Sequence, residues 1–448
     1  MMCKSTQVSS EVEVVDKMVL DKIISLAKRR GFVFQSSEIY GGFAATWDYG
    51  PLGVELKNNV KKLWWNSVVR SRLDVVGMDS AILMHPDVWV ASGHVEGFND
   101  PMIDCLTCRA RFREDFMEKP GQCPSCGGKD ITEPRQFNLM FKTQAGSMEG
   151  ATQDVYLRPE TAQGIFVQFK NVMTSARMKL PFGIAQIGKS FRNEVTTKSF
   201  IFRSREFEQM ELEYFVKPGE DDEWFAYWIK EREDWYIRYG VKPEHLHRRE
   251  HDKNELSHYS KGTIDLEFDF PFGRKELEGI ANRTDFDLKA HIEKSGKDLV
   301  YFDEETREKV VPYCIESSAG VDRALLTFLC DAYEEDVIEN EERVVLRFHP
   351  AVAPIKIAVF PLMRKDPQIN LAMQIFDQLK LQYNCQYDQT GSIGKRYRRQ
   401  DEIGTPYCIT VDFDSLEDGA VTIRNRDETD QVRIKVGELK SWFNGKFD

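Results

Sequence analysis

The segment 191–215, FRNEVTTKSFIFRSREFEQMELEYF, constrains the fold more than any other part of the sequence. Side chains of a β-strand point alternately to its two faces, and here polar and charged residues alternate with apolar ones such as Met210 and Leu212. We therefore predict a strand, a turn and a second strand. Short apolar runs between turn residues recur elsewhere, so the sheet is expected to be largely antiparallel. One face of the second strand holds Arg203, Arg205, Phe207, Gln209, Glu211 and Glu213.

The order of side chains along this face suits ATP beside an amine. Guanidinium groups bind phosphates, an aromatic ring stacks on a base, and carboxylates bind an ammonium group. Arg192 adds a guanidinium from the preceding strand, and Arg323 adds another from the helix expected after Gly320. Such a site acts by positioning and by stabilising a leaving pyrophosphate, with Mg²⁺ expected on the phosphates. An exposed strand with cross-strand ion pairs is the alternative.

Length and composition indicate several domains and exclude some functions. A chain of 448 residues with 41% hydrophobic and 30% charged residues is typical of a globular protein. Its net charge of −12 argues against a surface built for bulk nucleic-acid or membrane binding. No stretch is apolar enough for a membrane helix, and the N-terminus lacks the pattern of a secretory signal, so we expect a cytoplasmic protein.

A change of pattern near residue 350 predicts a second domain. From Ile355 the chain alternates strand-like and helix-like runs, which is typical of an α/β domain, and the proline-containing join FHPAVAPIK marks the boundary. The expected domains are 1–349 and 350–448, with insertions in the first at 101–135, rich in cysteine, and at 216–260, helical.

Two cysteine pairs predict a structural zinc site. Cys105 and Cys108 form one CxxC pair, and Cys123 and Cys126 form another. This spacing supplies four thiolates to a tetrahedral Zn²⁺ and leaves no position open for catalysis. Close pairs indicate metal binding in a reducing compartment more than disulfides. Four unligated surface thiols are the alternative.

Two further patterns carry competing interpretations. GIAQIGKS at 183–190 matches the phosphate-loop pattern, but strand-like sequence follows where a phosphate loop needs a helix, so a phosphate-loop nucleotidase is the disfavoured reading. KRYRR at 395–399 is typical of an RNA contact, with a solvated basic turn as the alternative. The RNA-binding residues expected there are Lys395, Arg396, Arg398 and Arg399.

These motifs together resemble those of class II aminoacyl-tRNA synthetases. Phe191-Arg192-Asn193-Glu194 with Arg205-Glu206-Phe207 is similar to motif 2, and Gly320-x-x-Arg323 is similar to motif 3. Motif 1 would be the helix from Gly53 to Arg70 with a strand that ends near Pro86. The strings WDYGPLGVELKNN, RPETAQGIF, FEQMELEYF, CIESSAGVDR and GKRYRRQDEIGTPYC resemble the homodimeric glycyl-tRNA synthetase family along nearly the whole chain.

The resemblance implies an α+β architecture. A seven-stranded antiparallel class II catalytic sheet flanked by helices would dimerise through motif 1. The cysteine-rich segment would be a zinc-ribbon-like insertion, and the C-terminal α/β domain would bind the anticodon.

The resemblance also implies roles for single residues. Arg192 and Arg323 would be catalytic, on the α- and γ-phosphates, and Phe207 would stack on adenine. The other ATP-binding residues implied are Asn193, Glu194, Phe202, Arg203, Arg205, Glu276, Leu277, Gly320 and Asp322. Glycine would be bound by Arg113, Glu160, Phe207, Gln209, Glu211, Glu316 and Ser318. The chain has Glu316-Ser317-Ser318 and Gly273-Arg274-Lys275 where the family often has Glu-Pro-Ser and Gly-Trp.

The reaction implied consumes ATP. Glycine and ATP would give an enzyme-bound glycyl-adenylate and pyrophosphate, and the terminal ribose of tRNA-Gly would then accept the glycyl group. Because glycine has no side chain, a clash against added bulk discriminates better than an attractive pocket. A catalytically inactive relative that binds nucleic acid as a dimer is the alternative.

Overall fold

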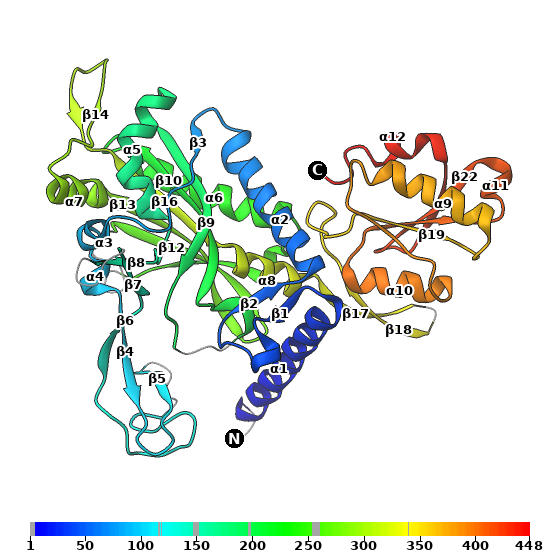
Figure 1. Ribbon diagram of the computed structural model, residues 1–448, viewed down its shortest axis with the longest axis horizontal. Helices are drawn as coiled ribbons and strands as arrows, with labels where there is room; N and C mark the ends of the chain where they lie inside the picture. The colour runs from blue at the N-terminus through cyan, green and yellow to red at the C-terminus, as the bar shows by residue number, and fades with distance from the viewer. Residues whose placement is uncertain are drawn as a thin grey trace.

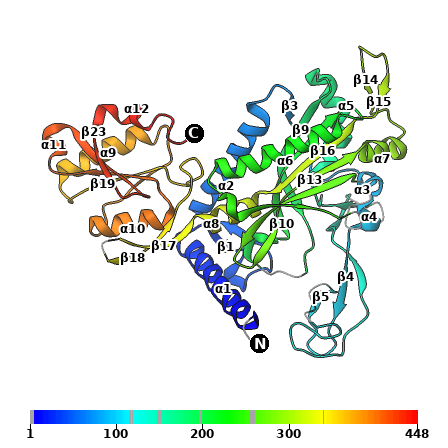
Figure 2. The same cartoon turned by 180° about the vertical axis from the view of Figure 1, so that it is seen from behind.

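The computed structural model describes residues 5–448 except 115, 116, 118, 147–151, 196–198, 253–259 and 339. Figure 1 shows a larger body and a smaller body, with the hairpin of β17 (Tyr333–Ile338) and β18 (Glu341–Leu346) between them. Figure 2 shows the same division from behind. None of the helices among the described residues is both long enough and apolar enough to span a membrane.

A seven-stranded sheet organises the larger body. Its order is β11–β12–β13–β16–β10–β9–β3. Neighbouring strands are antiparallel except β9 and β3, which are parallel, so the largely antiparallel sheet predicted from the sequence is confirmed. The strands are β3 (Val75–Gly77), β9 (Phe182–Phe191), β10 (Glu206–Val216), β11 (Leu246–Glu250), β12 (Gly262–Phe270), β13 (Gly273–Thr284) and β16 (Tyr313–Gly320).

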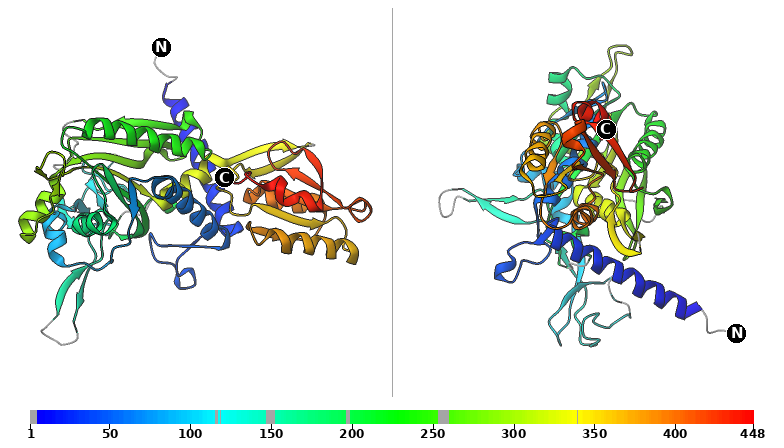
Figure 3. Two further views of the ribbon diagram at one scale, coloured as in Figure 1. Left: turned by 90° about the horizontal axis from the view of Figure 1, so that it is seen from above. Right: turned by 90° about the vertical axis from the view of Figure 1, so that its right-hand side faces the viewer.

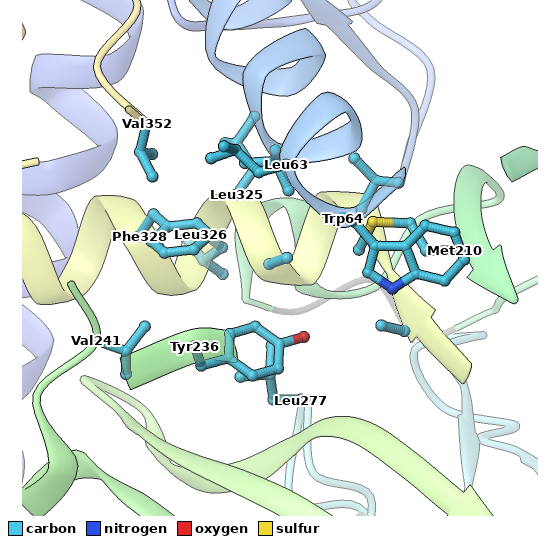
Figure 4. Close-up of a cluster of buried hydrophobic side chains, with 14 of the residues drawn as sticks. Leu63, Trp64, Met210, Tyr236, Val241, Leu277, Leu325, Leu326, Phe328 and Val352 are labelled. Carbon is cyan, nitrogen blue, oxygen red and sulfur yellow. The ribbon is translucent and has the colours of Figure 1, made fainter. Parts of the chain in front are cut away.

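Helices cover both faces of this sheet. Apolar side chains from α1, α2, α6 and α8 form one core with β10, and Figure 4 shows Trp64 and Met210 within it. On the other face α5 and α7 form a second core, where Phe169 packs on Phe215. Figure 3 shows α1 extending away from the larger body. The helices are α1 (Ser5–Arg30), α2 (Pro51–Trp65), α5 (Ala162–Ala176), α6 (Asp221–Arg238), α7 (Phe286–Ser295) and α8 (Val321–Ala332).

Local sequence signals set the helix ends that position the site. α2 begins at Pro51, whose fixed φ suits the first helical position. α8 begins directly after Gly320, which ends β16, so Arg323 lies in the first turn of a helix beside the sheet. The N-terminus of α8 therefore presents a partial positive charge next to β10.

Two sequence expectations about local structure need correction, and the rejection of a phosphate loop is confirmed. The extended run expected to include Arg203 begins only at Glu206, because residues 200–202 form a 3₁₀ turn entered through left-handed φ at Ser199 and Phe200. The strand after α2 ends at Gly77, and Pro86 instead opens the short helix α3 (Pro86–Ala91). The phosphate-loop pattern lies within β9, which confirms that it is a strand.

The segment 216–260 contributes to the main sheet as well as a helix. α6 packs on β13 and β16, as a helical segment should. Residues 246–250, however, form β11, the edge strand paired with β12. The run LHRRE has one buried residue among exposed and half-buried ones, so its strand character depends on the pairing with β12 more than on an apolar pattern. The segment expected as a helical insertion thus contains the helix α6 and, in addition, a strand of the main sheet.

Smaller elements surround the sheet. A three-stranded sheet in the order β5–β4–β6 carries the cysteine pairs and lies apart from the main sheet in Figure 1. Its strands are β4 (Asn99–Asp104), β5 (Arg111–Arg113) and β6 (Arg135–Asn138). The remaining elements of the larger body are β1 (Val33–Gln35), β2 (Trp47–Tyr49), α4 (His94–Gly97), β7 (Lys142–Ala145), β8 (Gln153–Tyr156), β14 (Tyr301–Phe302) and β15 (Lys309–Val310).

The smaller body is an α/β unit. Its sheet has the order β20–β19–β21–β22–β23, with β19 parallel to both β20 and β21. Arg343 of β18 is buried and contacts Asp401 of α10 at 3.2 Å, which ties the connecting hairpin to this unit. The elements are β19 (Ile357–Pro361), α9 (Asp366–Leu379), β20 (Cys385–Tyr387), α10 (Ile393–Ile403), β21 (Tyr407–Val411), α11 (Ser415–Asp418), β22 (Ala420–Asn425), β23 (Gln431–Lys435) and α12 (Leu439–Phe443).

Candidate active site

A cavity opens where β9, β10, β13 and β16 meet the N-terminus of α8. Most of the residues expected to bind ATP line it, although they come from segments more than 100 residues apart in sequence. The lining residues are Arg192, Glu194, Ile201, Phe202, Arg203, Ser204, Phe207, Gln209, Glu276, Leu277, Ser318, Gly320, Asp322 and Arg323.

Three guanidinium groups converge on this cavity. Arg192 lies 5.3 Å from the ring centre of Phe207 and donates a hydrogen bond from Nε to the carbonyl of Pro159 at 3.0 Å. Arg203 contacts the buried Glu194 at 3.5 Å. Together with Arg323 they give the cavity three guanidinium groups that can bind a polyphosphate, beside the carboxylates of Glu194 and Glu276 in the same lining.

Arg323 is held between a ring and a carboxylate. Its guanidinium lies 4.5 Å from the ring centre of Phe202, and its Nη1 lies 3.2 Å from Glu276 Oε1. Glu276 is about half exposed, so this ion pair is open to exchange with a ligand. The arrangement keeps the guanidinium extended toward the cavity while leaving its charge accessible.

Two residues expected to bind ATP lie outside the cavity lining, and a third, Asp322, is held by other parts of the fold. Arg205 does not line the cavity: its Nε donates to the carbonyl of Glu194 at 2.9 Å and its guanidinium covers Phe43. Asn193 is likewise absent from the lining. The carboxylate of Asp322 accepts hydrogen bonds from Tyr49, from Lys57 at 2.9 Å and from the backbone N–H of Glu208 at 2.9 Å. Asp322 therefore fixes the first turn of α8 to α2, which sequence spacing could not show.

Arg113 also lies away from this cavity. It belongs to β5 of the cysteine-bearing sheet and contacts Asp100 at 3.3 Å. Figure 1 shows β5 projecting from the main body. In this conformation Arg113 does not meet the other residues expected to bind glycine.

Buried carboxylates continue the same face of β10 beyond the cavity lining. Glu211 is buried opposite Ser318 of β16 and accepts a hydrogen bond from Thr161 Oγ1 at 2.7 Å. Glu316 of β16 forms an ion pair with Arg283 at 2.5 Å. Glu160, in the loop before α5, lies 3.2 Å from His94 Nε2. Three of the expected glycine-binding carboxylates are thus anchored from three different elements.

Gln209 and Ser318 connect the two ends of the site. Ser190 Oγ donates to Gln209 Oε1 at 2.7 Å, and Gln209 Nε2 donates to Ser318 Oγ at 3.3 Å. Both Gln209 and Ser318 line the cavity between the arginines and the carboxylates. The chain of hydrogen bonds orients the amide so that its position is fixed before a ligand arrives.

The carboxylates differ in their tendency to hold a proton. Burial, with the neighbouring charges of Glu316 and Glu160, raises the pKa of Glu211 to about 8. Burial also raises the pKa of Glu316 despite its partner Arg283. Burial would raise the pKa of Glu160 as well, but the interaction with the adjacent His94 lowers it by more. The pKa of Glu160 is therefore well below its usual range. Glu160 is therefore the carboxylate that stays charged most readily.

Sequence reasoning missed the residues that support these carboxylates. Arg283 of β13 contacts both Glu316 and Asp287, and Thr161 holds Glu211. His94 lies in the short helix α4, far from the recognised motifs. The alternation of side chains along β13 could have placed Arg283 on the sheet face that α5 covers. No pattern could have placed Thr161 and His94, because they lie in irregular or short segments.

The four cysteines meet in one cluster. Cys105 Sγ lies 3.7 Å from Cys126 Sγ, and Cys108 Sγ lies 3.7 Å from Cys123 Sγ. Four thiolates at 2.3 Å from one Zn²⁺ stand roughly 3.8 Å apart, so the spacing fits a tetrahedral zinc ion. Backbone N–H groups that follow the cysteines donate to the sulfur atoms, for example Gly128 to Cys126 at 3.4 Å. The donor set and the spacing suit a structural metal.

The basic run KRYRR forms part of α10, where an exposed turn was the alternative expected. Arg396 is buried, and its guanidinium donates to the carbonyl groups of Pro361 and Leu362. Arg399 forms an ion pair with Asp388, and Arg398 lies 3.8 Å from Asp401. The Nη groups of Arg396 thus stabilise the fold, and RNA binding by this residue stays a prediction. Lys395 alone of the expected set is exposed.

Comparisons with known proteins match this geometry. Residues 141–332 match the model "tRNA synthetase class II core domain (G, H, P, S and T)", and residues 356–446 match "Anticodon binding domain". The solved structure of Giardia lamblia prolyl-tRNA synthetase in complex with prolyl-adenylate is similar in fold, with a TM-score of 0.68 at 15% identity over 95% of this chain and 75% of that chain. The fold and the site thus define a class II tRNA synthetase.

Relatives of known name show which family of class II synthetases the chain belongs to. The glycine–tRNA ligase of Acetivibrio thermocellus is 58% identical over 460 residues, covering 96% of this chain and 99% of the relative. The glycine–tRNA ligases of Bacillus anthracis and Treponema denticola are each 56% identical, covering 95% of this chain and 99% and 96% of their own lengths. The chain belongs to the glycine–tRNA ligase family.

Proposed function

We propose that the chain attaches glycine to tRNA-Gly through an enzyme-bound glycyl-adenylate. One observation carries this proposal: a cavity lined by guanidinium groups lies next to buried carboxylates on the same face of β10 and β16. Polyphosphate and ammonium are the two charged ends of the ATP and amino-acid pair, and each meets its complement.

The first step needs no general base, because the attacking group is already an ionised carboxylate. A glycine carboxylate oxygen bonds to the α-phosphorus of ATP while the bond to pyrophosphate breaks. Arg192 holds the α-phosphate, Arg323 exchanges Glu276 for the terminal phosphate, and Phe207 stacks on adenine. Fixed guanidinium groups stabilise charge as it develops and require no reorganisation at the moment of reaction.

The carboxylate end selects the amine. Glu160, Glu211 and Glu316 surround the glycine ammonium, with Gln209 and Ser318 at its side. In the second step a terminal ribose hydroxyl of tRNA attacks the carbonyl carbon of the adenylate and AMP leaves. The hydrogen-bonded amide of Gln209 keeps its orientation through both steps.

Two metals fit the residues present. Glu194 and Glu276 offer carboxylate oxygens at the phosphate end, the ligands that Mg²⁺ prefers, and Mg²⁺ there would neutralise phosphate charge. The cysteine cluster would hold Zn²⁺ and fix the fold of the β4–β6 sheet.

Three further assignments belong to the same proposal. The domain boundary lies near residue 350, before the matched anticodon-binding segment. Two copies of the chain associate through α2 and β3, the motif 1 elements. The reduced cysteines and the tRNA substrate fit a cytoplasmic enzyme.

Charging of tRNA tests the proposal. Purified protein with ATP, Mg²⁺, labelled glycine and a tRNA-Gly transcript should form acid-precipitable glycyl-tRNA, whereas a tRNA-Pro transcript should not be charged. The inactive-relative alternative predicts that tRNA-Gly is bound without being charged. The arginines lining the cavity favour the active enzyme, since a protein that binds only RNA has no need of them.

A further inference from the structure

Glu213 is a buried carboxyl that the proposed reaction does not use. It follows Glu211 by two residues on β10 and therefore points to the same face of the sheet. Its side chain is completely buried, deeper than those of Glu316 and Glu160, which are 14% and 17% exposed. The carboxylate oxygens of Glu211, Glu213 and Glu316 lie within 4.8 Å of one another.

Glu213 has poor partners for a negative charge. Its Oε2 accepts a contact only from the thiol of Cys314 at 2.9 Å, and its Oε1 has no hydrogen-bond partner among the described residues. Glu211 has the hydroxyl of Thr161, and Glu316 has the guanidinium of Arg283. Burying a charged carboxylate with one oxygen that accepts no hydrogen bond costs far more free energy than burying the neutral acid.

The register makes a charge on Glu213 still less favourable. Glu213 lies directly opposite Glu316 in the β10–β16 pair, where like charges destabilise a sheet. Charged and titratable groups face Glu213 from several elements, and only one of them is a permanent cation. They are Glu211 on β10, Glu316 and Cys314 on β16, and Arg283 on β13, with Glu160 and Asp287 facing Glu316 from the α5 and α7 sides.

We propose that Glu213 is a permanently protonated positioning residue whose neutral carboxyl backs the ammonium-facing carboxylates Glu211 and Glu316. Its proton removes the opposed charges across the strand pair. Its O–H gives this buried cluster a hydrogen-bond donor that an ionised Glu213 would lack, with carboxylate oxygens of Glu211 and Glu316 within 4.8 Å. Burial, followed by the charge of Glu316, raises the pKa of Glu213 well above its ordinary value, in agreement with this role. The inference about glycine rests on the proposed function, but the location of the proton does not.

Unfolding experiments locate the proton without any substrate. Unfolded chains release a glutamic acid proton near pH 4.3, whereas folded wild type would retain it, so wild-type stability should fall relative to Glu213→Gln as pH rises from 5.5 to 8.5. The melting temperature of wild type minus that of Glu213→Gln should therefore decrease steadily as pH rises. Glu223→Gln, an exposed glutamate on α6, is the matched control and should show no such trend. A constant difference for Glu213→Gln would overturn the proposal.

Infrared spectroscopy gives an independent reading. The spectrum of wild type minus Glu213→Gln at pH 8 should contain the carbonyl band of a protonated carboxylic acid. The symmetric and antisymmetric bands of a carboxylate in its place would overturn the proposal. Neither outcome depends on glycine, ATP or tRNA, so a failure here is distinct from a failure of the proposed function.

Kinetics test the positioning role. Glu213→Gln keeps a neutral donor and should leave the KM for glycine within about threefold of wild type, whereas Glu213→Leu lacks a donor and should raise it about tenfold or more, with the KM for ATP unchanged. A Gln variant as impaired as Glu316→Gln would make Glu213 a charged ligand of the ammonium. A Leu variant that matches wild type would remove the positioning role. If the Leu variant does not fold, the Gln variant, the unfolding series and the infrared spectrum still decide.

Discussion

The two ends of the cavity obtain their charge in opposite ways. At the phosphate end Arg192 and Arg323 lie on aromatic rings and Arg203 lies beside Glu194, and all three guanidinium groups line the cavity, so their charges stay accessible. At the ammonium end Glu211 and Glu213 are almost fully buried behind the cavity lining. Guanidinium groups keep their charge under all these conditions, whereas carboxylates can take up a proton.

This difference gives the two ends different sensitivities. The phosphate end should respond to removal of a charge and very little to pH. The ammonium end should respond to pH as well, because its carboxylates compete for protons. The first two predictions below test the charges and the third tests the protons.

The largest effect should come from Arg323. Arg323→Ala removes a guanidinium aimed into the cavity, and we expect ATP–pyrophosphate exchange to fall by about 10²-fold or more. Arg205→Ala is the matched comparison, because the Arg205 guanidinium covers Phe43 outside the cavity lining. This variant should lower the rate of exchange by less than about tenfold. Equal losses in the two variants would contradict the distinction that the structure makes between them.

A charge lost at the ammonium end should change glycine binding alone. Glu316→Gln removes one charge-assisted contact, so we expect the KM for glycine to rise by about 10- to 100-fold with little change in the KM for ATP. Arg283 keeps Asp287 as a partner in this variant, so the fold should persist. Glu206→Gln, an exposed residue of β10, serves as the control. A rise in the KM for ATP of the same size would place Glu316 elsewhere in the mechanism.

Glycine binding should strengthen as pH rises toward 8. The pKa of Glu211 is raised to about 8, so below this pH the carboxyl is mostly neutral, and the glycine ammonium favours its ionised form. The KM for glycine should fall by up to about tenfold between pH 6.5 and 8, while the KM for ATP stays nearly constant. The comparison is made by exchange kinetics across that range. A KM for glycine that does not change with pH would show that Glu211 is already ionised at pH 6.5.

The smallest effects should separate two neighbours on α10. Lys395→Ala should weaken tRNA binding slightly, while adenylate formation is unchanged. The slope of the logarithm of the tRNA-binding constant against the logarithm of salt concentration should become smaller by about one. Arg396→Ala should instead lower the free energy of unfolding by about 1–3 kcal/mol, because two buried carbonyl groups lose their donor. Filter binding at several salt concentrations and chemical denaturation distinguish them. A stable Arg396→Ala protein with weakened tRNA binding would reverse the assignment.

Alternation and spacing predicted the sheet and most of the cavity. The polar face of β10 and the helix after Gly320 follow from local pattern, and the structure contains both. Arg192 follows the end of β9 and Arg323 lies in the first turn of α8, and both line the cavity. The resemblance to class II synthetases added Glu160 and Glu316, which no local pattern distinguishes.

Sequence could not predict which charged side chains face the ligand. Arg203 and Arg205 are two residues apart, yet the 3₁₀ turn at 200–202 leaves one at the cavity and turns the other onto Phe43. Asp322 precedes Arg323 but binds Lys57, since a one-residue step on a helix rotates the side chain by about 100°. Arg396 is buried by the packing of α10 on β19, a tertiary effect that a basic run does not reveal.

Amino-acid-dependent exchange of ATP with pyrophosphate tests the central claim most directly, that one cavity activates glycine with ATP. Purified protein should be assayed with glycine, alanine and serine separately, without tRNA. We expect exchange with glycine and, at equal concentration, almost none with alanine or serine. Exchange with no amino acid would contradict adenylate formation, and equal exchange with alanine would contradict the assignment of the carboxylate end to glycine.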